Sequence, residues 1–140
     1  MSHAVLDTNI LVSALMRPDG PPGRVMLAVK EGALVPVFSL AVFAEYESVL
    51  RRPRLRLDAA KVNAALATMR LVGTTVRGDP PPLPAGLPDD KDWPFIACAL
   101  AACCPVITGN ARDFPARLGV SVMTAREWVD EAAAHSRQPP

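Results

Sequence analysis

The sequence predicts an α/β fold, a three-layer α/β/α sandwich around a central, mainly parallel sheet. Short apolar runs typical of buried strands alternate with helical patterns along the whole chain. The chain has 140 residues, enough for one domain with a substantial core. Half of the residues are hydrophobic and 21% are charged, a balance that argues against disorder.

The first half of the chain supplies strands at 3–6 (HAVL) and 33–38 (ALVPVF), with a weaker strand at 73–76. Helical patterns cover 24–32 after two prolines, 40–52 up to Pro53, and 59–72. Ser39 and Asp58 are residue types that cap helices, so we expect them to cap the second and third of these helices.

A proline-rich stretch at 78–88 separates the two halves. Its five prolines exclude a helix, so we expect a stiff surface linker. A domain boundary is the alternative, but neither half alone holds a complete set of layers. We therefore expect a single domain over 1–128, with 129–140 forming the end of the last helix and a flexible tail.

The second half repeats the alternation of helix and strand. We expect a buried helix at 93–104, a strand at 105–108, a short turn or helix at 112–118, a strand at 120–123, and a final helix capped by Thr124. In such a sheet, right-handed crossovers place the carboxyl ends of all strands at one edge, where ligands bind.

Composition limits the location of the protein and its partners. The net charge is +1, so attraction for nucleic acid must come from a local patch or from bound metal. Asp7 and Asn9 interrupt the first apolar stretch, which lacks the features of a signal peptide. No apolar run reaches the roughly 18 residues of a membrane span, and a cytoplasmic protein is expected.

The three cysteines, Cys98, Cys103 and Cys104, are odd in number, and two are adjacent. This pattern does not suit a disulfide framework, and no histidine lies near enough in sequence for a zinc site. We expect reduced core thiols on a helix.

Acidic residues stand where the predicted strands end or helices begin. Asp7 follows the first strand directly, and Asp113 follows the strand at 105–108. Each has a structural alternative, since Asp7 or Asn9 could cap a helix for about 1 kcal/mol. Three acids, Asp89, Asp90 and Asp92, crowd the start of the helix at 93–104. One of them is explained as a helix cap, but three would repel one another unless a cation were bound.

The helix at 40–52 offers two glutamates. Glu45 and Glu47 flank its apolar stripe on opposite edges, so periodicity does not choose between them. A solvated helix face is the alternative for both.

Four segments, LDTNIL, SLAVFAEY, DWPFIACALAA and VITGNARDF, resemble in their order and spacing the motifs of PIN domains. The resemblance covers about Ala4 to Trp128 and is greatest for the branch of VapC-like ribonucleases, the toxins of toxin–antitoxin pairs. It implies the three-layer fold, RNA as the substrate, a cognate antitoxin protein as a partner, and a homodimer.

Carried over by position, the resemblance implies four acids as catalytic and metal-binding residues: Asp7, Glu45, Asp92 (with Asp90 as the alternate third acid) and Asp113. Glu45 is preferred over Glu47 because it stands six residues after Ser39 and precedes Tyr46. Supporting polar groups are implied at Thr8, Asn9, Ser39, Thr108 and Asn110. Some relatives carry an acid where this chain has Asn110, which leaves one charge fewer here for a second metal.

Carboxylates without nearby histidine suit Mg²⁺ or Mn²⁺, which would activate water and offset charge on the phosphate. If the chain is PIN-like, the products carry 5′-phosphate and 3′-hydroxyl ends. Four arginines near one helix end, Arg51, Arg52, Arg54 and Arg56, could contact RNA or an acidic partner, or could simply be solvated.

There are two alternatives to a nuclease. A phosphoacceptor receiver domain also gathers acids at a sheet edge, but it needs paired acids at the first strand and a lysine after the last strand. The lysines here are Lys30, Lys61 and Lys91. A PIN-like module that binds RNA or protein without cutting would be marked by loss of the acids, and all four are present.

Overall fold

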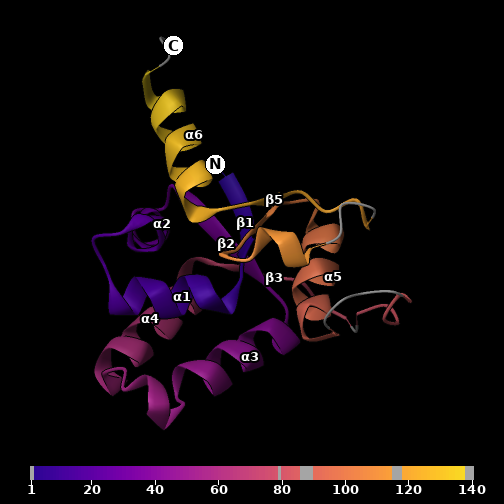
Figure 1. Ribbon diagram of the computed structural model, residues 1–140, viewed down its shortest axis with the longest axis horizontal. Helices are drawn as coiled ribbons and strands as arrows, with labels where there is room; N and C mark the ends of the chain where they lie inside the picture. Colours follow the sequence, from indigo (N-terminus) through magenta and orange to yellow (C-terminus); the bar gives the residue numbers. More distant parts are fainter. Residues whose placement is uncertain (1, 79, 86–89, 115–117, 138–140) are drawn as a thin grey trace.

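A single parallel sheet forms the centre of the computed structural model, which describes residues 2–78, 80–85, 90–114 and 118–137, without the side chains of Asp90, Asp113, Ser136 and Arg137. The strand order is β3-β2-β1-β4-β5, and all four described strand pairings are parallel (Figure 1). The strands are β1 (Ser2–Leu6), β2 (Leu34–Phe38), β3 (Thr74–Thr75), β4 (Val106–Ile107) and β5 (Val122–Met123).

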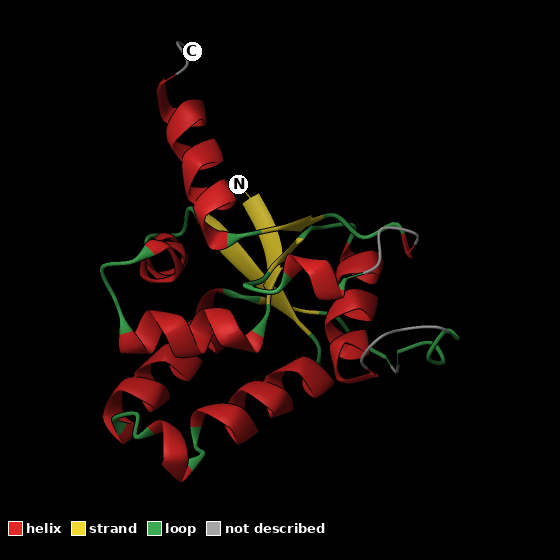
Figure 2. Ribbon diagram, in the orientation of Figure 1, coloured by secondary structure: helices red, strands yellow, loops and turns green. Residues whose placement is uncertain are grey.

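Helices cover both faces of this sheet. They are α1 (Thr8–Met16), α2 (Pro21–Lys30), α3 (Leu40–Leu50), α4 (Ala59–Val72), α5 (Trp93–Ala102) and α6 (Ala125–Arg137). In Figure 2 the helices α1, α2 and α4 lie on one side of the sheet and α5 on the other. The predicted three-layer sandwich is therefore confirmed. Among the described residues, no helix is long and apolar enough to cross a membrane.

Three short 3₁₀ turns complete the fold: η1 (Pro53–Leu55), η2 (Asp90–Asp92) and η3 (Ala111–Asp113). Strands from both sides of the proline-rich stretch join the one sheet, β3 beside β2 and β4 beside β1. The indole nitrogen of Trp93 donates to the carbonyl of Pro81 at 2.8 Å and so ties part of this stretch to the start of α5. Residues 79 and 86–88 of the predicted linker, and 115–117 of the predicted turn, lie outside the described residues.

Local capping chemistry sets the helix starts as the sequence predicts. The Ser39 hydroxyl accepts from the Val42 amide at 3.2 Å, and the Asp58 carboxylate accepts from the Ala60 amide at 2.9 Å. At α6, Thr124 and Glu127 bond reciprocally through side chain and backbone amide, at 3.0 and 3.1 Å. These three predicted caps are confirmed.

Some predicted boundaries are wrong. The predicted helix at 24–32 begins earlier, at Pro21, because proline is tolerated in the first turn of a helix. The predicted helix at 93–104 ends at Ala102, because Cys103 adopts a left-handed conformation with φ of 53°. The strand predicted at 105–108 is reduced to Val106–Ile107, and proline at position 105 has no amide to donate.

The cysteine prediction is correct for Cys98 and wrong for Cys103. Cys98 is buried on α5, and burial, with a smaller effect from Cys104, raises the pKa of its thiol to about 12. Burial also raises the pKa of Cys104, which is half-buried just past the helix. Cys103 is exposed. It is itself the left-handed residue that ends α5, and there the chain turns away from the core.

Tyr46 anchors α3 on the carboxyl end of β1. It is fully buried, and its hydroxyl donates to the carbonyl of Leu6 at 2.5 Å. Its ring packs edge-on against Phe43 at 5.9 Å and tilted against Phe95 of α5 at 6.3 Å. Helix α3 also packs against α1 and α4, so it reaches from one helical layer to the other. This position brings the middle of α3 to the edge where β1 ends.

Burial raises the pKa of Tyr46 well above 10, with smaller contributions from the nearby Cys98 and Asp7. The protonated hydroxyl therefore contributes stability that is complete below pH 10 and is lost as pH rises toward the folded-state pKa. Because the chain has one tyrosine, absorbance at 295 nm should follow this group alone. We expect ionisation near pH 10 in urea and only at clearly higher pH in the native protein.

Tyr46→Phe is the matched variant, because it keeps the ring and removes the hydroxyl. We expect it to lower the free energy of unfolding by about 1–3 kcal/mol at neutral pH and to reduce the alkaline loss of stability. Ionisation of Tyr46 near pH 10 in the native protein would contradict this account.

Candidate active site

Asp7 occupies the carboxyl end of β1. It is buried, with 9% of its surface exposed, and stands at the N-cap position of α1. Its side chain makes no capping bond to α1. Instead, Oδ2 accepts a hydrogen bond of 2.6 Å from the hydroxyl of Thr108, a fully buried residue at the end of β4. The capping alternative therefore does not account for the orientation of this carboxylate.

The polar residues around Asp7 join the ends of β1 and β4. Asn9 Oδ1 accepts from the Gly109 amide at 3.2 Å. The Thr108 hydroxyl, besides donating to Asp7, accepts from the Asn110 amide at 3.0 Å. The structure thus brings together Asp7, Asn9, Thr108 and Asn110 from segments about a hundred residues apart in sequence.

Thr8 contributes a polar atom without an internal partner. The residue is 7% exposed, and its Oγ1 is buried with no hydrogen bond to any part of the chain that the structure describes. Leaving a buried hydroxyl unsatisfied costs about 1–3 kcal/mol. An ordered water or a hydrated ion beside Asp7 would satisfy it, and a hydroxyl at this place fits an oxygen-lined metal site.

Glu45 and Glu47, which periodicity could not distinguish, have different environments. Glu47 Oε1 forms an ion pair with Arg70 of α4 at 2.6 Å, and the Arg70 guanidinium lies 4.4 Å from the centre of the Phe43 ring. Glu45 is half-buried and forms no hydrogen bond or ion pair with the residues described. It precedes Tyr46, the residue anchored to the end of β1. Glu47 is thus occupied in joining α3 to α4, whereas Glu45 makes no such contact with the described residues. Ser39 has a structural function as the cap of α3.

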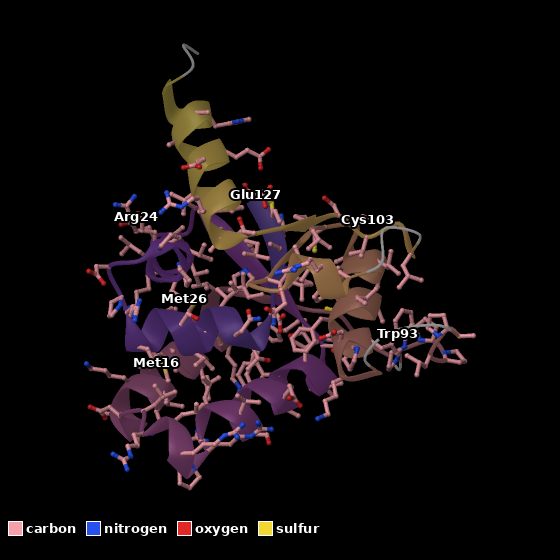
Figure 3. The ribbon with its side chains drawn as sticks, viewed as in Figure 1. Met16, Arg24, Met26, Trp93, Cys103 and Glu127 are labelled. Carbon is pink, nitrogen blue, oxygen red and sulfur yellow. The ribbon has the colours of Figure 1, made fainter. Side chains whose placement is uncertain are left out.

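Asp92 leads into α5 from the adjoining turn η2. It is half-buried, and its side chain makes no capping bond to α5. The cap predicted among Asp89, Asp90 and Asp92 is therefore not Asp92, and Asp89 lies outside the described residues. Trp93 follows it at the start of α5, where Figure 3 shows its ring beside the proline-rich segment. The side chains of Asp90 and Asp113 lie outside the description, although their backbones belong to η2 and η3.

The donor atoms at this edge are oxygens. Within the described part of the chain, no three His, Cys, Asp or Glu side chains gather closely enough to hold a metal ion. This statement does not include Asp90 and Asp113, two of the predicted ligands, because their side chains lie outside the described part of the structure. Asp7 and the unpartnered Thr8 hydroxyl are oxygen donors, the type that suits Mg²⁺ or Mn²⁺ rather than a softer ion, but the structure does not bring the described side chains of Glu45 and Asp92 together with Asp7 as a metal-binding cluster.

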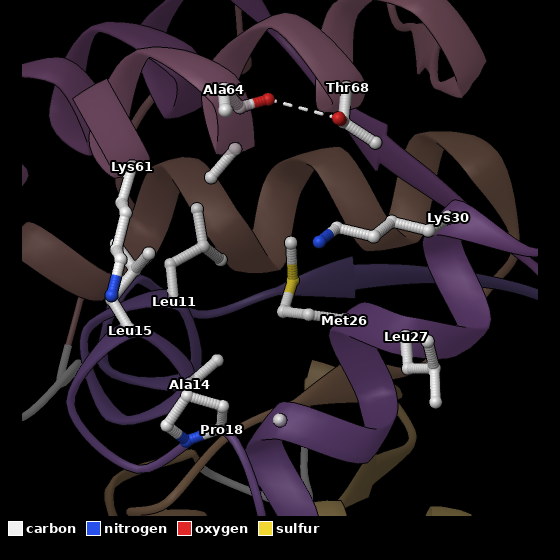
Figure 4. A pocket seen from close by; sticks show the side chains of 12 residues that line it. Leu11, Ala14, Leu15, Pro18, Met26, Leu27, Lys30, Lys61, Ala64 and Thr68 are labelled. Carbon is white, nitrogen blue, oxygen red and sulfur yellow. Dashed lines mark hydrogen bonds between the residues drawn. The ribbon is translucent and has the colours of Figure 1, made fainter.

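Two cavities differ in their relation to this edge. One, of about 470 Å³, opens at the carboxyl ends of β4 and β5 and is lined by Gly109, Asn110, Ala111, Arg112 and Thr124. Arg112 was not singled out from the sequence, although its place between Asn110 and Asp113 was an available signal. The other cavity, of about 390 Å³, lies between α1, α2 and α4, is mainly apolar and contains no carboxylate (Figure 4). Of the two, only the first cavity adjoins the polar residues Thr108 and Asn110 that lie beside Asp7.

A family comparison identifies this fold. The model of the PIN domain family matches residues 3–112. The chain belongs to the PIN domain family. This membership makes the fold a nuclease-type fold, since PIN domains are generally nucleases and typically use divalent metals. The match ends one residue before Asp113.

The chain is also similar to an uncharacterized protein of Methanocaldococcus jannaschii, MJ1680. The two are 27% identical over an alignment of 138 positions, and the alignment covers 91% of this chain and 89% of the relative. The receiver-domain alternative is wrong, because receivers have the strand order 2-1-3-4-5, whereas this PIN domain has 3-2-1-4-5.

Proposed function

We propose that this PIN domain is a cytoplasmic endoribonuclease that hydrolyses RNA phosphodiester bonds with Mg²⁺ or Mn²⁺ as its cofactor. The observation that carries the proposal is the buried Asp7 carboxylate, oriented by Thr108 and placed beside an unsatisfied Thr8 hydroxyl. Four acids would hold the metal and water: Asp7, Glu45, Asp92 (or Asp90) and Asp113.

Each neighbouring group has a distinct task in this mechanism. Thr108 fixes the Asp7 carboxylate, and the Tyr46 anchor holds α3 so that Glu45 stays at the same edge. Arg112, at the adjoining cavity, can pair with a phosphate of the substrate. Bound Mg²⁺ or Mn²⁺ would lower the pKa of a water and offset charge on the phosphate.

The proposed reaction is an in-line displacement at phosphorus. Water adds to the phosphorus atom, the bond to the 3′ oxygen breaks, and the departing oxygen takes a proton. The products are a 5′-phosphate and a 3′-hydroxyl end.

Cleavage of labelled RNA tests this function. We expect cleavage with Mn²⁺ or Mg²⁺ and none with EDTA. Asp7→Asn and Glu45→Gln should each lower the rate by roughly 100-fold or more, because several kcal/mol of charge stabilisation are lost. Glu47→Gln is the matched control and should retain cleavage, because it removes only an exposed ion pair.

Melting temperature without metal separates a catalytic defect from unfolding. Asp7→Asn should melt at or above the wild-type temperature, because asparagine can still accept from Thr108 and repulsion among carboxylates falls. The site assignment is wrong if Asp7→Asn cleaves near the wild-type rate, or if Glu45→Gln and Glu47→Gln lose activity equally. Cleavage in EDTA by protein free of contaminating ribonuclease contradicts the metal mechanism.

We also propose that the protein is the toxin of a toxin–antitoxin pair. Two observations support this: the VapC-like order of the four motifs, and the apolar groove between α1, α2 and α4. Figure 4 shows the ammonium groups of Lys30 and Lys61 on either side of Leu11 and Met26 in this groove. Such a groove is complementary to an amphipathic helix with acidic residues, which a small antitoxin could supply.

The product of the neighbouring gene is the candidate antitoxin to test. Its affinity for the PIN domain, measured by calorimetry, should fall at least tenfold in the double variant Lys30→Glu/Lys61→Glu, because two favourable charge contacts become repulsive. Arg126→Glu, on the exposed part of α6, is the control and should leave the affinity unchanged. Equal affinity for all three proteins would contradict this docking site.

A symmetric homodimer is proposed from two exposed leucines. Leu40 and Leu71 are 81% and 85% exposed, and each stands two residues from the close contact between Phe38 and Gly73. Large apolar side chains exposed on neighbouring helix ends are typical of an interface. Light scattering should give a dimer mass for the wild type and a monomer mass for Leu40→Glu/Leu71→Glu. A monomeric wild type at high micromolar concentration would contradict the dimer.

A further inference from the structure

Four exposed arginines are concentrated where α3 turns into α4. Arg51 directly follows α3 at its C-cap position, and Arg52 and Arg54 belong to the turn around η1. Arg56 closes the turn in a left-handed conformation with φ of 52°. We call Arg51, Arg52, Arg54 and Arg56 the arginine turn.

None of these guanidinium groups pairs with an acid in the described part of the chain. The nearby acid Glu47 is already paired with Arg70 of α4. Arg51 donates instead to the neutral side-chain oxygen of Asn63 on α4, at 2.9 Å. Because the whole chain carries a net charge of +1, the turn is a strong local concentration of positive charge. Such a patch is complementary to a polyanion.

The backbone of the arginine turn is well ordered by hydrogen bonds. The amide of Leu55 donates to the Arg52 carbonyl and the amide of Arg56 to the Pro53 carbonyl, both at 3.1 Å. The contact of Arg51 with Asn63 and the Asp58 cap fix the turn to α4. The arginines therefore project from a fixed platform, and less entropy is lost when they bind a ligand.

The arginine turn and the candidate active site share one rigid element. Helix α3 carries Glu45, and Arg51 follows six residues later, roughly 9 Å along the axis at 1.5 Å per residue. Figure 1 shows α3 beneath the carboxyl ends of the strands, with the turn at its end away from α5. A strand of RNA at the carboxylate edge could follow α3 to the arginine turn. The length of RNA needed for this would fall within the roughly 4–16 nucleotides that a single-strand-binding fold covers.

Carboxylates at the active-site edge repel the phosphates of RNA, so positive charge away from Asp7 and Glu45 favours substrate binding. We propose that Arg52, Arg54 and Arg56 bind backbone phosphates of single-stranded RNA on one side of the cleaved bond, and that Arg51 positions the turn. RNA is favoured over an acidic protein because the patch is joined to Glu45 by a single helix. This inference rests on the proposed ribonuclease function.

Salt-dependent binding tests the inference without requiring cleavage. All proteins carry Asp7→Asn, and fluorescence anisotropy in EDTA measures their affinity for a labelled single-stranded RNA across a salt series. The triple variant changes Arg52→Gln, Arg54→Gln and Arg56→Asn, since asparagine tolerates the left-handed conformation. We expect about a tenfold or larger loss of affinity. The slope of log K against log salt should shrink by about 2, roughly 0.7 for each lost phosphate contact.

A second triple variant controls for overall charge. Arg17→Gln, Arg24→Gln and Arg126→Gln remove the same charge from exposed positions elsewhere. Arg24, on α2, lies near α6 in Figure 3, far from the arginine turn. This control should change the salt slope much less than the first variant. The single variant Arg54→Gln should change it by about 0.7, which keeps the test valid if the triple variant does not fold.

The outcomes separate this inference from the ribonuclease function. Equal slopes for the two triple variants, or no RNA binding by the parent protein, would overturn the inference even where wild-type cleavage is intact. Absence of metal-dependent cleavage by the wild type would overturn the ribonuclease function, while the binding comparison would still decide whether the arginine turn contacts RNA.

Discussion

The parallel pairing of β1 with β4 is the constraint on which the candidate site depends. The register places Leu6 opposite Ile107, so the next residues, Asp7 and Thr108, leave the sheet side by side. The amide of Asp7 donates to the Ile107 carbonyl at 2.9 Å and fixes this register at the point where the strands end. A slip of one residue would turn Thr108 to the opposite face and remove the partner of the Asp7 carboxylate.

The elements around Asp7 keep its carboxylate buried, although a folded chain usually keeps carboxylates exposed to water. Burying a carboxylate is costly unless it is hydrogen-bonded, and the Thr108 hydroxyl meets part of that cost. The Tyr46 hydroxyl holds α3 against the same strand end, so Glu45 cannot move away from the edge without breaking a buried contact. A metal ion or an ordered water at this edge would give the buried Thr8 hydroxyl the partner that the described residues do not supply.

Local signals in the sequence predicted most of the fold. The strands, the three caps and the helix at 59–72 follow from periodicity and from the residue types that begin helices. The end of α5 at Ala102 was not predictable in the same way, because the left-handed conformation at Cys103 is not written in its residue type. The position of Asp7 at the sheet edge also follows from topology, since parallel strands end at the same edge.

Contacts between distant segments were the part that the sequence could not provide. The hydrogen bond between Asp7 and Thr108 joins residues 101 positions apart and depends on β4 lying next to β1, which no periodicity encodes. Likewise, Glu45 and Glu47 are equivalent on a helical wheel, and they differ only because α4 packs so that Arg70 meets Glu47. Family resemblance chose Glu45, and the free environment of this residue in the structure is consistent with that choice.

The central claim is that the edge formed by β1 and β4 binds a divalent cation through Asp7. Anomalous diffraction from crystals soaked in Mn²⁺ tests it most directly. The account predicts an anomalous peak within roughly 2.0–2.6 Å of an Asp7 carboxylate oxygen, the range for hard cations, and its loss from Asp7→Asn crystals. No peak at this edge, or a peak only elsewhere, such as beside the acids of α6, would contradict the account.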